Sequence, residues 1–67
     1  MLDSEKFKKF NGVLMLMSHD VKSQNWLLRH SISQDILDEM VSSGYLIFYE
    51  KDDDGYYMPT EKSKEIW

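Results

Sequence analysis

Apolar residues recur every three or four positions at the start of the chain. Such spacing places their side chains on one face of a helix. The residues of that face are Phe7, Phe10, Leu14 and Met17. With Asp3 or Ser4 as its cap, a first helix is predicted over about residues 3–17. The run Val13–Met17 alone also fits a short buried strand, but the helical spacing begins earlier and favours the helix.

Two shorter helices are predicted after a polar break. The first covers about residues 23–30, with Ser23 as its N-cap and Val21 in a brief extended stretch before it. The second covers about residues 33–43 and is capped by Ser31, which lies at capping-box spacing from Gln34, or by Ser33. Its apolar stripe consists of Ile36, Leu37, Met40 and Val41.

The hydrophobic period changes after Gly44, whose lack of a side chain suits the left-handed end of a helix. A hairpin region is predicted over about residues 45–59, with Asp54-Gly55 as the tip of its turn. Pro59 ends the second strand because it cannot donate a ladder hydrogen bond. Thr60 is then the predicted N-cap of a last helix over about residues 60–67.

Three helices followed by a hairpin are the order of a winged helix-turn-helix domain. The segment Trp26–Leu46, the hairpin and Tyr57–Lys62 resemble the winged-helix repressors of the MarR and PadR type, in a match over about residues 5–67. Ser63 departs from the pattern, because those families carry a Gly there. The resemblance implies one α+β winged-helix domain over residues 1–67, with the hairpin as its wing. It also implies a non-enzymatic, DNA-binding transcriptional regulator that acts as a homodimer.

Composition narrows the class of protein. The chain has 67 residues, enough for one domain with one core. It has no Cys, so disulfides and cysteine-based zinc fingers are excluded. Its short apolar runs and the absence of a recognisable signal peptide lead us to expect a soluble, cytoplasmic protein without a membrane span. The initial Met favours a complete natural protein.

Charge weakens the DNA interpretation. The net charge is −4, whereas phosphate binding needs clustered Lys and Arg. The DNA-contact candidates are Lys22, Asn25, Arg29, Ser33, Gln34 and Lys51. Each of them also fits an ordinary role as a solvated surface group or a cap. Carboxylates, in contrast, fill the outward side of the third helix and the wing, where a groove-reading surface is normally neutral or positive.

The alternative is a module that binds a basic protein of the transcription or replication machinery, or that mimics nucleic-acid charge. Exposed aromatic residues would anchor such a partner. The partner-contact candidates are Asp35, Asp38, Glu39, Tyr49, Asp53 and Tyr56. His19 and His30 lack the converging ligands of a metal site and are interpreted as surface or capping residues, so no metal or cofactor is expected. The sequence therefore supports DNA and a protein partner almost equally.

Overall fold

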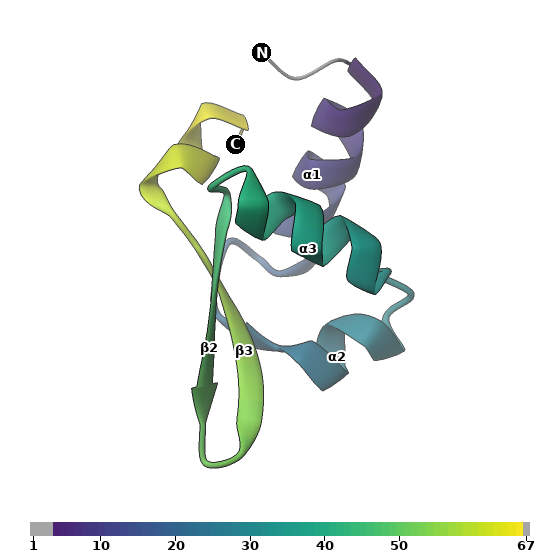
Figure 1. Cartoon of the computed structure of the whole chain (residues 1–67). Helices are drawn as coiled ribbons and strands as arrows, with labels where there is room; N and C mark the ends of the chain where they lie inside the picture. Colours follow the sequence, from purple (N-terminus) through teal and green to yellow (C-terminus); the bar gives the residue numbers. More distant parts are fainter. Residues whose placement is uncertain (1–3, 67) are drawn as a thin grey trace.

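The computed structural model describes residues 4–66. Its elements are α1 (Ser4–Leu16), β1 (Lys22–Ser23), α2 (Gln24–Arg29), α3 (Gln34–Ser42), β2 (Leu46–Lys51), β3 (Asp54–Pro59) and the 3-10 helix η1 (Glu61–Ile66) (Figure 1). The predicted α+β class is therefore confirmed. The predicted cap Asp3 and the helix end at Trp67 lie outside the described residues.

Helix α1 forms where the three-and-four spacing predicts it and continues through Val13 to Leu16, so the strand alternative is wrong. Its inward face buries Phe10, Val13 and Leu14 completely or nearly so, and Met17 just beyond the helix is fully buried. Phe7 belongs to the same spacing but is 41% exposed, because the first turns of α1 extend past the core. No helix within residues 4–66 is long and apolar enough to cross a membrane.

A two-residue strand that the sequence does not reveal separates α1 from α2. The chain turns after α1 through Ser18 and His19, both of which have a positive φ. It then forms β1, in which Lys22 pairs with Tyr57 and Ser23 with Tyr56 of β3. Two residues are too few to show a strand period, although the expected extended stretch at Val21 lies directly before it.

Both short helices begin at serine caps. The Ser23 hydroxyl accepts a hydrogen bond from the Trp26 amide at 3.1 Å, and the Ser33 hydroxyl accepts one from the Ile36 amide at 3.2 Å. Ser23 is thus confirmed as the first cap, and Ser33 is the cap of α3. The capping-box assignment of Ser31 is wrong, since its φ of 68° is left-handed and an N-cap needs extended backbone.

The sheet is antiparallel and has the strand order β1-β3-β2. Strands β2 and β3 form the predicted hairpin, with Lys51 paired to Asp54 next to the turn. The tip is Asp52-Asp53, with φ values of 54° and 68°, so the expected tip at Asp54-Gly55 is wrong. Asp tolerates this left-handed conformation better than most residues, which explains how the turn forms without glycine.

The segment after the hairpin packs back on the end of α3. Thr60 directly precedes η1, as predicted, and its carbonyl accepts from the Ser63 amide at 3.1 Å. The Thr60 hydroxyl donates to the Gly44 carbonyl. Lys62 Nζ donates to the Ser43 carbonyl at 2.8 Å. Gly44 has a φ of 86°, the left-handed conformation predicted for it. η1 is therefore held against the α3–β2 connection.

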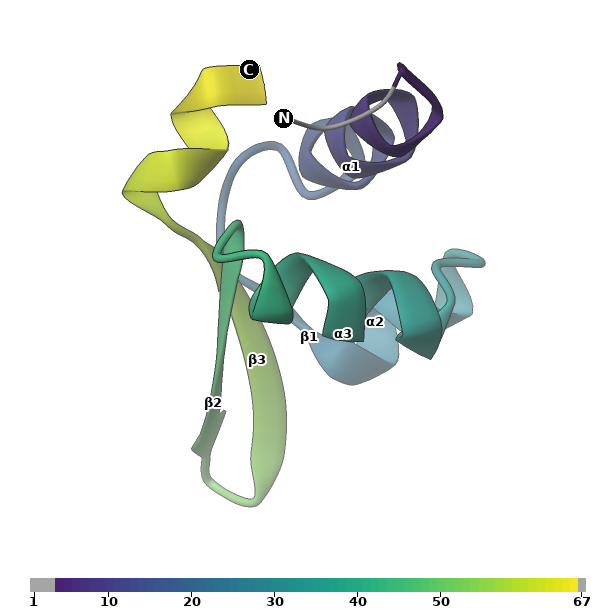
Figure 2. The ribbon, with the colours of Figure 1, turned by 45° about the horizontal axis from the view of Figure 1, so that its top comes forward.

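One core joins the helices to the sheet. Leu14, Leu27, Leu37 and Met40 are fully buried in it, and Ile32 packs against it from the turn between α2 and α3. Its other buried hydrophobic members are Phe10, Val13, Met17, Tyr45, Leu46, Tyr57 and Ile66. The tip of the β2–β3 hairpin projects at the end of the molecule opposite η1 (Figures 1 and 2).

Candidate functional site at the α3–hairpin junction

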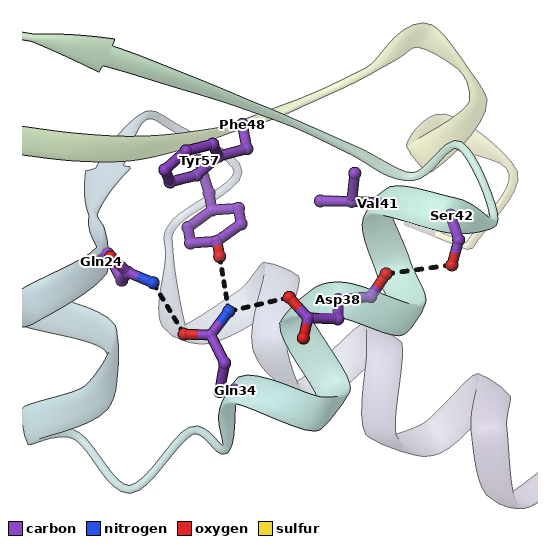
Figure 3. A pocket seen from close by; sticks show the side chains of 7 residues that line it. All are labelled: Gln24, Gln34, Asp38, Val41, Ser42, Phe48 and Tyr57. Atoms are coloured by element: carbon purple, nitrogen blue, oxygen red, sulfur yellow. Dashed lines mark hydrogen bonds between the residues drawn. The ribbon is translucent and has the colours of Figure 1, made fainter.

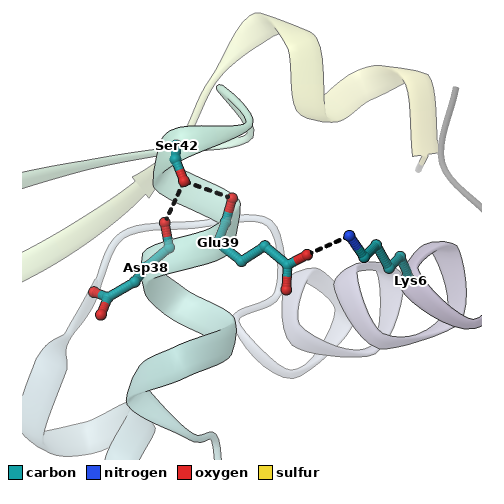
Figure 4. Close-up of polar contacts among 4 residues, drawn as sticks. All are labelled: Lys6, Asp38, Glu39 and Ser42. Carbon is teal, nitrogen blue, oxygen red and sulfur yellow. Dashed lines mark hydrogen bonds and ion pairs between the residues drawn. The ribbon is translucent and has the colours of Figure 1, made fainter.

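The outward side of α3 carries exposed carboxylates. Asp35 and Asp38 are both exposed, as the helical period predicts, while Leu37 and Met40 are buried on the opposite side. Ser42 Oγ donates to the Asp38 carbonyl at 3.0 Å, so this hydroxyl is engaged with its own helix (Figure 4). We call Asp35 and Asp38 the acidic face of α3.

Glu39 does not belong to this acidic face. Its Oε1 lies 2.7 Å from Lys6 Nζ, in an ion pair between α3 and α1 (Figure 4). Both side chains are partly exposed, so the pair adds little to stability, but it neutralises the Glu39 charge locally. Glu39 was a partner-contact candidate, and the structure directs it toward α1 instead.

A polar network holds the start of α3 to α2 and β3 (Figure 3). Gln34 Nε2 donates to Asp38 Oδ1 at 2.8 Å and to the Tyr57 hydroxyl at 2.9 Å. Gln34 Oε1 accepts from Gln24 Nε2 at 2.7 Å. These three bonds fix the Gln34 amide in one orientation. A carboxylate has no hydrogen to donate, so the group that faces Asp38 must be the amide NH₂ of Gln34.

An open pocket of about 420 Å³ lies beside this network, between α3 and the hairpin. Its lining is Gln24, Gln34, Asp38, Val41, Ser42, Phe48 and Tyr57 (Figure 3). The rings of Phe48 and Tyr57 are tilted, with centroids 5.1 Å apart, and Phe48 is 40% exposed. The pocket thus combines an exposed aromatic ring, two amides and one carboxylate, and no lysine or arginine is among its lining residues.

Gly55 leaves space for the Phe48 ring, which forms one wall of the pocket. A Cβ at this position would lie 2.7 Å from Phe48 Cε1 and 2.8 Å from its Cζ, closer than such atoms approach in proteins. The Phe48 ring therefore lies directly over the Gly55 backbone. The absence of a side chain at Gly55 sets the position of one pocket wall, although the sequence suggested only a turn for this glycine.

The structure leaves the DNA-contact candidates dispersed. The Ser33 hydroxyl caps α3 and the Gln34 amide is held in the network. Lys22 Nζ lies over the Trp26 ring, 5.0 Å from its centroid. The remaining candidates, Asn25, Arg29 and Lys51, are exposed. They come from α2 and from the end of β2, and none lines the pocket.

The partner-contact candidates do not lie on one surface: Asp35, Asp38 and Glu39 are on α3, and the others are in the hairpin. Tyr49 and Tyr56 are direct cross-strand partners with stacked rings, 5.6 Å between centroids. They alternate with Phe48 and Tyr57, so they lie on the sheet face away from the pocket. Asp53 is exposed at the hairpin tip. Of these candidates, Asp38 lines the pocket, and Asp35 is exposed one turn before it on α3.

Sequence reasoning missed most of the pocket lining. Five lining residues were not among the predicted site residues, because the pocket is formed by four different elements: Gln24, Val41, Ser42, Phe48 and Tyr57. His30 is the C-cap residue of α2, which confirms its capping role, and its ring stacks on that of Trp26 at 4.0 Å. Within residues 4–66, no group of three His, Asp or Glu side chains is placed to hold a metal ion.

Comparison with known proteins identifies no relative. No family model, curated protein or solved structure matches the chain.

Proposed function

We propose that the chain is a non-enzymatic winged-helix module whose α3–wing surface binds a basic protein segment. In this proposal β2 and β3 form the wing, α2 and α3 the helix-turn-helix, and the partner belongs to the transcription or replication machinery of the cytoplasm. The element order supports the winged helix: one helix, a short strand, two helices and a hairpin. Strand β1, which the sequence pattern did not predict, lies at one edge of the sheet beside β3.

The position of Asp38 is the observation that favours a basic partner. This carboxylate is exposed and lines a pocket that contains the Phe48 ring but no cationic side chain. A carboxylate beside an aromatic ring suits a guanidinium or ammonium group, which gains both a charge-assisted hydrogen bond and a cation–π contact. An arginine or lysine side chain of the partner is therefore the occupant that the pocket chemistry favours.

The same placement disfavours DNA at this surface. A winged helix usually presents its α3 surface to the major groove, close to the phosphates. Asp35, Asp38 and the aspartates at the tip would face those phosphates, and no lysine or arginine is among the pocket-lining residues around Asp38. Helix α3 is thus better suited to a positive partner.

Binding of a labelled arginine-rich peptide, measured by fluorescence anisotropy, tests the proposal. The double variant Asp35→Lys/Asp38→Lys should bind at least about tenfold more weakly than the wild type. Glu5→Lys/Glu65→Lys is the matched control, because it changes the net charge equally at exposed positions on α1 and η1. Equal losses in the two double variants would contradict a specific role for the acidic face.

DNA binding by a homodimer is the second candidate. The exposed placement of Asn25 and Arg29 on α2 favours it, with Lys22 and Lys51 as further phosphate contacts. A gel shift with a salt titration separates the two functions. Duplex DNA that is bound at low salt and released steeply as salt rises would support this candidate, whereas no shift at low salt would eliminate it.

A further inference from the structure

Strand β2 has an unpaired edge. It is the outer strand of the order β1-β3-β2, and within residues 4–66 no other strand pairs with its far side. Both ribbon views show that side open along the hairpin (Figures 1 and 2). The strand is six residues long and contains neither Pro nor Gly, and its charged residues Glu50 and Lys51 lie only at the wing end. An edge of this kind is a template for pairing with another strand.

The register determines which backbone groups point outward. The Thr60 amide donates to the Tyr45 carbonyl at 3.1 Å, so these two residues form a hydrogen-bonded pair next to the hairpin. Such pairs alternate along an antiparallel ladder. The following hydrogen-bonded pairs are therefore Ile47–Met58, Tyr49–Tyr56 and Lys51–Asp54. The N–H and C=O groups of Leu46, Phe48 and Glu50 consequently face the open edge.

Pro59 agrees with this assignment. It lies opposite Leu46, at a position where the alternation requires no hydrogen bond to β2. A proline has no N–H to donate, so it is tolerated at such a position.

The same strand exposes apolar side chains on both sheet faces. Ile47 is 46% exposed and Phe48 is 40% exposed, and successive strand residues point to opposite faces. A partner that covers one face would bury only one of the two. A partner that extends the sheet beyond β2 would contact both.

We propose that a second copy of the chain pairs with this edge, β2 against β2, antiparallel about a two-fold axis at Phe48. This register uses every outward residue: Phe48 pairs with Phe48 of the second copy, and Leu46 pairs with Glu50 of the second copy. Each pair exchanges two backbone hydrogen bonds. Ile47 then lies directly opposite Tyr49 of the second copy. The proposal does not depend on which partner binds α3.

Charge complementarity favours a second copy over an unrelated strand. The register carries the hairpin tip of one copy toward residues 43–44 of the other. There, Lys62 Nζ donates to the Ser43 carbonyl and lies over the Tyr45 ring, 4.9 Å from its centroid. The exposed tip residues Asp52 and Asp53 would meet this cation twice in the dimer, once on each side of the axis. Antiparallel pairing also keeps the two acidic tips apart.

Cysteine cross-linking tests the register in an otherwise cysteine-free chain. Ile47→Cys and Tyr49→Cys chains are mixed and oxidised gently. The mixture should form the disulfide-linked heterodimer at least about tenfold faster than either chain alone, because the two positions face each other at the close, non-hydrogen-bonded spacing. Met58→Cys, on the same sheet face but one strand further from the axis, is the matched control and should cross-link only slowly.

Sedimentation equilibrium tests the backbone pairing. The wild type should reach twice its 8.0 kDa mass as its concentration rises. Glu50→Pro removes an outward N–H while leaving the hairpin ladder intact, and should weaken dimerisation at least about tenfold, whereas Glu50→Ala should not. If circular dichroism shows that Glu50→Pro is unfolded, the cysteine mixtures decide. A monomer throughout, equal dimerisation of both Glu50 variants, or cross-linking without preference for the mixed pair would overturn the proposal.

Discussion

The hydroxyl of the buried Tyr57 accepts a hydrogen bond from Gln34 Nε2 at 2.9 Å, which ties the middle of β3 to the first residue of α3. Because Gln34 also bonds Gln24 and Asp38, one amide fixes the position of α2, α3 and the hairpin relative to one another. The pocket beside it therefore has a pre-formed polar wall, which limits the ordering cost of binding.

Gln34→Ala should lower the free energy of unfolding by about 1–3 kcal/mol, because the Tyr57 hydroxyl is left without this donor inside the protein. Urea denaturation measures the change. Gln24→Ala is the control: it removes only one of the three bonds and should cost less. Equal stability of Gln34→Ala and the wild type would show that the network does not hold α3 to the sheet.

Gly55→Ala should destabilise the protein by about 1–3 kcal/mol, because the new methyl group displaces the Phe48 ring. Gly12→Ala is the matched substitution at a site with no atom within 4 Å of the new Cβ. Since Gly12 lies within α1, that change should raise stability by about 0.5–1 kcal/mol. Thermal denaturation compares the two variants. A destabilising effect of the same size at both positions would contradict the close packing of Phe48 on Gly55.

Ser33→Ala should cost about 1 kcal/mol, because the Ile36 amide loses its capping acceptor. Ser31→Gly should instead leave stability unchanged or raise it by up to about 1 kcal/mol, since glycine adopts the left-handed conformation of this residue without strain. Chemical denaturation of both variants checks the assignment. If Ser31→Gly lost more stability than Ser33→Ala, the N-cap of α3 would be Ser31 and not Ser33.

The helices were predictable because their burial follows a local period. Leu37 and Met40 face the core while Asp35 and Asp38 face solvent, as the spacing of α3 requires. The exposed Phe7 shows the limit of this reasoning, because a period gives the face of a helix but not how far the core extends along it.

The site was less predictable because long-range pairing creates it. Gln34 and Tyr57 are 23 residues apart in sequence, and no local pattern indicates that they touch. The same holds for β1, whose two residues are strand only because β3 lies beside them. The tip at Asp52-Asp53 was missed because the Asp-Gly pair is the stronger local turn signal, whereas the register of β2 against β3 decides the turn.

The most direct test of the central claim, that α3 presents an acidic surface for a cationic partner, is an amide chemical-shift titration. Labelled protein is titrated with the arginine-rich peptide and, separately, with duplex DNA at low salt. Binding as proposed moves the amide signals of α3 and of Phe48 with the peptide and leaves them unmoved with DNA. Peptide shifts confined to α1 and η1, or DNA shifts centred on α3, would contradict the claim.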